Sequence, residues 1–282
     1  MPYIKTKNEN PINLFYQDLG KGKPVIFIHG WPSSHALWEY QLAELPKKFR
    51  CVAYDRRGFG NSDKPWTGYD YDTFADDLHA VIETLNLSDV TLVGFSMGGG
   101  EVVRYLSRHG ASRISKIVLV SAVTPFLLKT SDNEDGAPQK TFDDMIDGIK
   151  EDRPKFLTEF GKQFFGVTLL KKPVSDELLQ WAHYLTLSAT QQSATECVRA
   201  FSSTDFRKDC SAITIPTLII HGDEDKIVPI DISAKKAVKL IKNAELKIYE
   251  GAPHGLYVTE KDKLNKDLIE FIGVTSKVEA AV

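Results

Sequence analysis

Short apolar runs alternate with longer amphipathic stretches along most of the 282-residue chain. The runs have the length of buried strands, and the stretches between them have the apolar spacing of helices that cover a sheet. Alternation of this kind predicts an α/β fold with a mostly parallel, doubly wound sheet and helices on both faces. Residues 3–6 and 14–18 are expected to add an antiparallel start to the sheet. The predicted parallel strands are residues 25–28, 51–54, 90–93, 117–120, 218–220 and 246–249.

The segment between the fourth and fifth predicted parallel strands differs from the rest of the chain. It has the pattern of several helices without a strand, and it is rich in aromatic residues. We therefore predict a helical cap at residues 123–210, inserted into an α/β core formed by residues 1–122 and 211–282. Most of the aromatic side chains of this segment are expected to form the cap's own core. The aromatic residues that indicate the cap include Phe126, Phe156, Phe160, Phe164, Phe165, Trp181, Tyr184 and Phe201.

Charge and cysteine content narrow the class of protein. The formal net charge is −3 with both signs interspersed, so no basic stripe favours nucleic acid and no polybasic segment favours a membrane surface. The widely spaced Cys51, Cys197 and Cys210 indicate reduced thiols rather than a disulfide framework. The first eleven residues lack the apolar core of a signal peptide, and the longest apolar runs are strand-sized. We expect a cytoplasmic protein that acts on a small molecule.

Residues 94–98 read Gly-Phe-Ser-Met-Gly, directly after an apolar run and before a helix-forming stretch. A Gly-x-Ser-x-Gly turn between a strand and a helix is a nucleophile elbow, and it makes Ser96 the predicted nucleophile. Its tight geometry requires glycines where a Cβ would meet neighbouring backbone. A dinucleotide or nucleotide site is disfavoured, because the chain contains neither Gly-x-Gly-x-x-Gly spacing here nor a Gly-Lys-Ser/Thr sequence.

A serine hydroxyl needs a base to accept its proton and an anion to orient that base. His254 follows the last predicted strand in the sequence Gly-Ala-Pro-His-Gly and is the predicted base. The acidic loop after residues 218–220 offers Asp223, Glu224 and Asp225 as the anion. Of the three, Asp225 is favoured as the anion, because Asp223 can also cap its own turn. Asp223 stays open as the alternative. The base should follow the serine and the acid in the chain, and the other histidines do not: His29, His35, His79, His109, His183 and His221.

Two backbone N–H groups are expected to form an oxyanion hole. One belongs to Met97 at the start of the predicted helix, and the other to Trp31 in the His-Gly-Trp-Pro loop after the first parallel strand. Each such donor contributes about 100- to 1000-fold in rate when it is aimed at a tetrahedral oxyanion. Pro32 disfavours the helical conformation for the residue before it, and we expect the Trp31 carbonyl to face the acyl pocket.

The order and spacing of these motifs resemble the α/β-hydrolase fold. Four further runs of sequence are similar to the cofactor-free bacterial haloperoxidases and their aryl esterase relatives. They are residues 54–62, 98–105, 201–206 and 227–229. The resemblance extends from residue 3 to residue 272. It implies a metal-free and cofactor-free Ser-Asp-His hydrolase of small esters. With hydrogen peroxide, such an enzyme converts a short carboxylic acid to a peracid, which then oxidises bromide or chloride.

Carried over to this chain, the resemblance implies Ser96 as nucleophile, Asp225 as acid and His254 as base, with the amides of Trp31 and Met97 as oxyanion donors. It thereby supports Asp225 over Asp223. A small pocket for acetate-sized acyl groups is implied as well, and Pro32 matches the family members that are associated with better perhydrolysis. The expected substrate-binding residues are Pro32, Phe95, Val123, Phe126, Ile227 and Leu256, from the resemblance and their loop positions.

Several other functions share these motifs. Carboxylesterases, lactonases and carbon–carbon bond hydrolases keep the serine. A ligand-sensing protein that turns over its ligand slowly and signals through cap closure keeps it as well. Epoxide hydrolases and haloalkane dehalogenases require a carboxylate where this chain has Ser96. A cation site at Asp223, Glu224, Asp225 and Asp231 is disfavoured, because the calcium-loop pattern is absent. The family often forms homo-oligomers, and the expected partners are an ester or carboxylic acid and hydrogen peroxide.

Overall fold

The computed structural model describes residues 2–7 and 11–273 and is built around one eight-stranded sheet. The strand order is β1-β2-β4-β3-β5-β6-β7-β8; β1 and β2 are antiparallel, and the strands from β4 to β8 run parallel. The α/β class, the parallel strands and the antiparallel start are thus confirmed. The strands are β1 Tyr3–Lys5, β2 Asn13–Leu19, β3 Pro24–Ile28, β4 Arg50–Tyr54, β5 Val90–Phe95, β6 Ile114–Val120, β7 Thr217–Gly222 and β8 Ala244–Tyr249.

Helices cover both faces of this sheet because successive strand residues point to opposite sides. In β3, Ile26 and Ile28 belong to one hydrophobic core and Val25 and Phe27 to the other. The first core includes residues of α2 Tyr71–Thr84, α3 Met97–His109 and α8 Ala234–Leu240, and the second those of α9 Leu256–Thr259 and α10 Lys261–Gly273. Shorter elements are η1 His35–Trp38, α1 Glu39–Leu42, η2 Leu45–Lys47 and α7 Arg207–Ser211.

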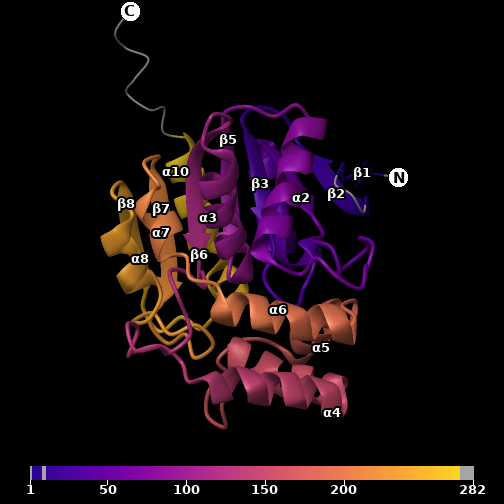
Figure 1. Cartoon of the computed structure of the whole chain (residues 1–282), viewed down its shortest axis with the longest axis vertical. Helices are drawn as coiled ribbons and strands as arrows, with labels where there is room; N and C mark the ends of the chain where they lie inside the picture. Colours follow the sequence, from indigo (N-terminus) through magenta and orange to yellow (C-terminus); the bar gives the residue numbers. More distant parts are fainter. Residues whose placement is uncertain (1, 8–10, 274–282) are drawn as a thin grey trace, which may run out of the picture.

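A helical insertion between β6 and β7 lies beyond one end of the sheet (Figure 1). It contains α4 Gln139–Phe164, α5 Asp176–Leu187 and α6 Gln191–Ser203. Helix α4 is kinked where Asp152 leaves the helical conformation, two residues before Pro154. All three helices fall inside the predicted cap, and the boundaries at 123 and 210 remain a prediction. None of the helices in the described part of the chain is long and apolar enough to cross a bilayer.

The four predicted site loops follow the carboxyl ends of β3, β5, β7 and β8. Because parallel strands end at the same edge of a sheet, residues from distant parts of the chain meet there. The insertion covers this edge, so the site lies between the sheet and the helices α4 and α6 (Figure 1).

Candidate active site

Ser96 lies at the apex of the turn between β5 and α3, with φ 53° and ψ −117°. A non-glycine residue in this conformation is strained and is held there by its surroundings. A Cβ at Gly94 would lie 2.5 Å from the Gly98 carbonyl oxygen, and one at Gly98 would lie 2.5 Å from the Ile28 carbonyl oxygen. The turn therefore requires both glycines and projects the Ser96 hydroxyl above the edge of the sheet.

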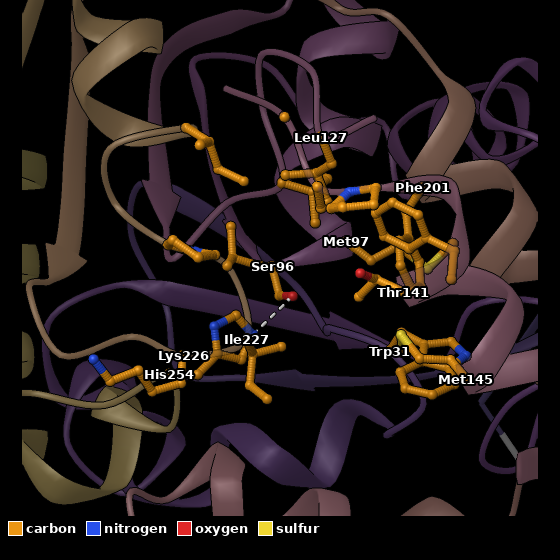
Figure 2. A pocket seen from close by; sticks show the side chains of 18 of the residues that line it. Trp31, Ser96, Met97, Leu127, Thr141, Met145, Phe201, Lys226, Ile227 and His254 are labelled. Atoms are coloured by element: carbon orange, nitrogen blue, oxygen red, sulfur yellow. Dashed lines mark hydrogen bonds between the residues drawn. The ribbon is translucent and has the colours of Figure 1, made fainter. Parts of the chain in front are cut away.

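His254 is in the loop after β8 and lies beside this hydroxyl. Its Nε2 is 3.0 Å from Ser96 Oγ (Figure 2), and its Nδ1 is 2.6 Å from Asp225 Oδ2. The exposed fractions of Ser96, Asp225 and His254 are 6%, 3% and 1%. The hydrogen-bonded chain from serine through imidazole to carboxylate can move the serine proton to Nε2 and stabilise the imidazolium that forms.

The Asp225 carboxylate has partners at both oxygens. Oδ1 accepts hydrogen bonds from the backbone N–H groups of Ile227, at 2.9 Å, and Val228, at 2.8 Å. Oδ2 faces His254 and also lies 3.2 Å from His221 Nε2. Burial acts to raise the pKa of the Asp225 carboxyl, but the two imidazoles outweigh burial and hold that pKa well below its usual range. Asp225 is thus an oriented anion that the sequence order of the loop alone did not single out.

The neighbouring acidic residues have other partners. Asp223 accepts a hydrogen bond from the Gly251 backbone N–H at 2.7 Å. Glu224 pairs with Lys171 at 3.1 Å, and Asp231 pairs with Lys235 at 2.7 Å. The four carboxylates considered as a cation site therefore make separate contacts. No group of three or more His, Cys, Asp and Glu side chains suited to a metal ion occurs among the described residues.

Met97 and Trp31, the residues of the two predicted oxyanion donors, come from two different elements. Met97 is the first residue of α3, so its backbone N–H has no acceptor within the helix. Trp31 follows β3, and its indole Nε1 donates a hydrogen bond to the Ala194 carbonyl of α6 at 3.0 Å. Both residues line the same cavity as Ser96. The site can therefore direct two backbone N–H groups toward an oxygen bound beside the serine.

A cavity of about 350 Å³ opens in front of Ser96. Figure 2 shows the serine hydroxyl directed into it, with Trp31 and Met145 on one side and Leu127 and Phe201 on another. This is the volume of the whole cavity, which is larger than an acetyl group, and the acetate-sized acyl pocket stays a prediction. Residues of α4 and α6 form part of the cavity wall, together with residues of the loops that follow β3, β5, β6, β7 and β8. Larger apolar side chains that the sequence did not assign to the cavity also line it, among them Leu127, Phe142, Met145, Phe160, Phe201, Val228 and Ile232.

The predicted substrate-binding residues divide into three groups. Val123 and Ile227 line the large cavity. Pro32 and Phe95 line a second cavity of about 30 Å³, which shares Trp31 and Phe160 with the first.

Phe126 and Leu256 line neither of these two cavities. The Arg207 guanidinium lies over the Phe126 ring, with its central carbon 5.2 Å from the ring centroid. Leu256 is fully buried in the core on the α10 side of the sheet. Loop position alone did not reveal these inward orientations. The aromatic pattern of the sequence indicates Phe160 and Phe201 as cap residues, but it favours the cap's own core for most residues of that set and does not assign these two to the cavity wall.

The whole chain is similar to known enzymes. A family model described as the alpha/beta hydrolase fold matches residues 23–261. A non-heme chloroperoxidase of Kitasatospora aureofaciens is 42% identical, over 96% of this chain and 99% of the relative. A bifunctional esterase/perhydrolase of Acinetobacter calcoaceticus is 40% identical, over 96% and 99%. The crystal structure of a bromoperoxidase from Bacillus anthracis has a TM-score of 0.92 and 45% identity, and the match covers 96% of this chain and 100% of that one.

Proposed function

Because the chain belongs to the α/β-hydrolase fold family, among its non-heme haloperoxidases and esterases, we propose that it is a serine hydrolase of small esters that also perhydrolyses short carboxylic acids. The observation that carries this proposal is the continuous hydrogen-bonded chain of Ser96, His254 and Asp225 at the wall of an apolar cavity. The oxyanion donors in the proposal are the backbone N–H groups of Trp31 and Met97.

Ester hydrolysis proceeds through an acyl enzyme in this proposal. Ser96 Oγ attacks the ester carbonyl while His254 Nε2 takes its proton, and the Asp225 carboxylate stabilises the imidazolium. The two backbone N–H groups bind the oxygen on which negative charge develops. The imidazolium then gives its proton to the departing alcohol, and a water activated by His254 releases the acid.

Perhydrolysis uses the same acyl enzyme with another second nucleophile. A carboxylic acid acylates Ser96 with release of water, and hydrogen peroxide then attacks in place of water, so the product is a peracid. The peracid transfers one oxygen atom to bromide, which is oxidised by two electrons to hypobromous acid as the peracid returns to the carboxylic acid. No metal takes part in these steps, and the reagents are the acid, the peroxide and the halide.

The cavity supports esters with a bulkier apolar part than acetate. Its volume of about 350 Å³ corresponds to roughly a dozen water molecules at about 30 Å³ each. Aromatic and methionine side chains make up much of its wall and can adapt to an apolar guest. We also propose that the Trp31 carbonyl, directed by Pro32, accepts a hydrogen bond from the peracid. An unchanged ratio of perhydrolysis to hydrolysis in Pro32→Leu would contradict that role.

Bromination of a chlorinated dione tests the proposed function. Purified protein is supplied with peroxide and bromide, with and without acetate, and Ser96→Ala is the control. We expect bromination that depends on both acetate and Ser96, because the peracid can form only through the acyl enzyme.

Hydrolysis of aryl esters without bromination would instead favour a plain carboxylesterase or lactonase. Negligible turnover combined with stabilisation by a ligand would favour a sensor. Each of these outcomes contradicts the perhydrolase part of the proposal, and the second contradicts the hydrolase part as well.

A further inference from the structure

The two proposed oxyanion donors belong to peptide groups whose carbonyls are held by the protein. A trans peptide is planar, so its C=O and N–H point in opposite directions and fixing one fixes the other. The Ser96 carbonyl, which shares a peptide with the Met97 N–H, accepts from the N–H groups of Gly99 at 3.0 Å and Val123 at 3.2 Å. Gly99 lies in the first turn of α3 and Val123 in the segment after β6, and both donate through backbone groups, so no side chain is needed for these contacts.

The other donor is held differently, because a side chain takes part. The Gly30 carbonyl shares a trans peptide with the Trp31 N–H. It accepts a hydrogen bond from the Ser33 backbone N–H at 3.1 Å and lies 2.9 Å from His29 Nδ1. The His29 ring is completely buried, beside this peptide. One backbone N–H and one ring nitrogen therefore face this carbonyl, and the ring nitrogen can donate to it only when it carries the proton.

The protein determines that proton's position. His29 Nε2 lies 3.0 Å from the Arg56 backbone nitrogen, which can only donate, so Nε2 is the acceptor. Burial, with a contribution from the charge of Arg56, lowers the pKa of His29 to about 3, and the ring is neutral at physiological pH. A neutral ring that accepts at Nε2 carries its proton at Nδ1, where it donates to the Gly30 carbonyl.

Arg56 also links this loop to the helix that carries the second donor. Its guanidinium donates to the His29 carbonyl at 3.0 Å and, through Nε, to Glu101 Oε2 at 2.6 Å. Glu101 lies on α3 one turn beyond Met97, and its other carboxylate oxygen accepts from the Tyr54 hydroxyl. Arg56 and Glu101 are both fully buried. One ion pair thus spans the two elements that supply the oxyanion donors.

We propose that His29, held by the buried Arg56–Glu101 pair, is a positioning residue that directs the Trp31 N–H into the oxyanion hole. The inference rests on the proposed serine hydrolase function and deepens it. His29 touches no reacting atom, and it acts through the Gly30–Trp31 peptide. Its loss should weaken binding of the transition state more than binding of the substrate, because the substrate carbonyl carries little charge.

Two amide substitutions separate the two ring nitrogens. His29→Asn keeps an N–H near the position of Nδ1, whereas His29→Gln places its amide near the position of Nε2 and leaves the Gly30 carbonyl without that donor. We expect His29→Gln to lower kcat for an aryl ester by about 10- to 100-fold with KM nearly unchanged, and His29→Asn to retain most of the activity. A boronic acid that forms an adduct with Ser96 should bind His29→Gln more weakly by a similar factor.

The neighbouring Arg57–Asp77 pair provides a matched control. Arg57 follows Arg56 in the loop after β4 and makes a buried bidentate ion pair with Asp77, at 2.6 and 2.7 Å. This pair connects the loop to α2 rather than to α3. Asp77→Asn should lower the melting temperature without the selective loss of kcat and of boronate affinity.

Equal kcat values for His29→Gln and His29→Asn, or a loss confined to KM, would overturn the inference while leaving the proposed function intact. Absence of ester hydrolysis in the wild-type protein would overturn the proposed function and the inference with it.

Discussion

At Asp225 the two oxygens of one carboxylate have different tasks. Oδ1 accepts from two backbone N–H groups of its own loop, and Oδ2 faces the imidazoles of His254 and His221. The backbone contacts orient the carboxylate, so the oxygen at 2.6 Å from His254 Nδ1 needs no rearrangement when the imidazolium forms. The anion is therefore prepared before substrate binds.

Replacing this carboxylate tests its role against that of its neighbour. Asp225→Asn should lower kcat for an aryl ester by about 10,000-fold, because the amide cannot stabilise the imidazolium and favours the wrong imidazole tautomer. Asp223→Asn is the matched control, since Asp223 is exposed and an asparagine oxygen can still accept from the Gly251 N–H. Steady-state kinetics of the two variants with the aryl ester show which of the two carboxylates the reaction requires. A comparable loss in both, or a loss only in Asp223→Asn, would contradict the assignment of Asp225.

Among the elements, the second half of α4 joins the cap to the reacting groups. Phe156, Phe160 and Phe164 recur every four residues and lie along one side of the helix. The Phe160 ring is 5.3 Å from that of Trp31, and the Phe164 ring is 4.9 Å from that of His254. The Phe164 carbonyl also accepts a hydrogen bond from the Gly255 N–H at 2.8 Å. One helix thus packs against both the oxyanion loop and the loop of the base.

Phe160 lines both the large cavity and the small one, as Trp31 does. Phe160→Ala should connect them and raise kcat/KM for a longer acyl ester relative to an acetate ester by about tenfold. A series of aryl esters of increasing acyl length measures the effect. Phe156→Ala is the control, since Phe156 lies against Phe160 but lines neither cavity. An unchanged chain-length profile in Phe160→Ala, or the same change in both variants, would contradict this role.

For the whole molecule, the sheet brings together residues that are up to 223 positions apart, from Trp31 to His254. The sequence predicted this arrangement because strand periodicity and the Gly-x-Ser-x-Gly turn are local patterns, as at Gly94 and Gly98. The sequence favours Asp225 but leaves Asp223 open, because both carboxylates lie in one loop. Only the folded loop shows which of them faces His254.

The parts of the site that the sequence did not predict depend on how helices sit against the sheet. Helical periodicity gives Phe160 and Phe201 an apolar face, but it does not say that this face lines a cavity rather than the cap's own core. The shape of that cavity depends on how α4, α6 and the loops around Ser96 pack together, which no local pattern encodes. The resemblance and loop position predict Phe126 and Leu256 as pocket residues, but Phe126 packs against Arg207 and Leu256 packs in the core on the α10 side of the sheet.

Titration with a fluorophosphonate tests most directly the claim that one serine carries both activities. Intact-protein and peptide mass spectrometry locate the label, while aryl ester hydrolysis and acetate-dependent bromination are followed in the same samples. We expect one phosphonyl group per chain, on Ser96, with both activities lost in proportion to labelling and no label at this position in Ser96→Ala. Bromination that survives complete labelling of Ser96, or ester hydrolysis that persists in Ser96→Ala, would contradict it.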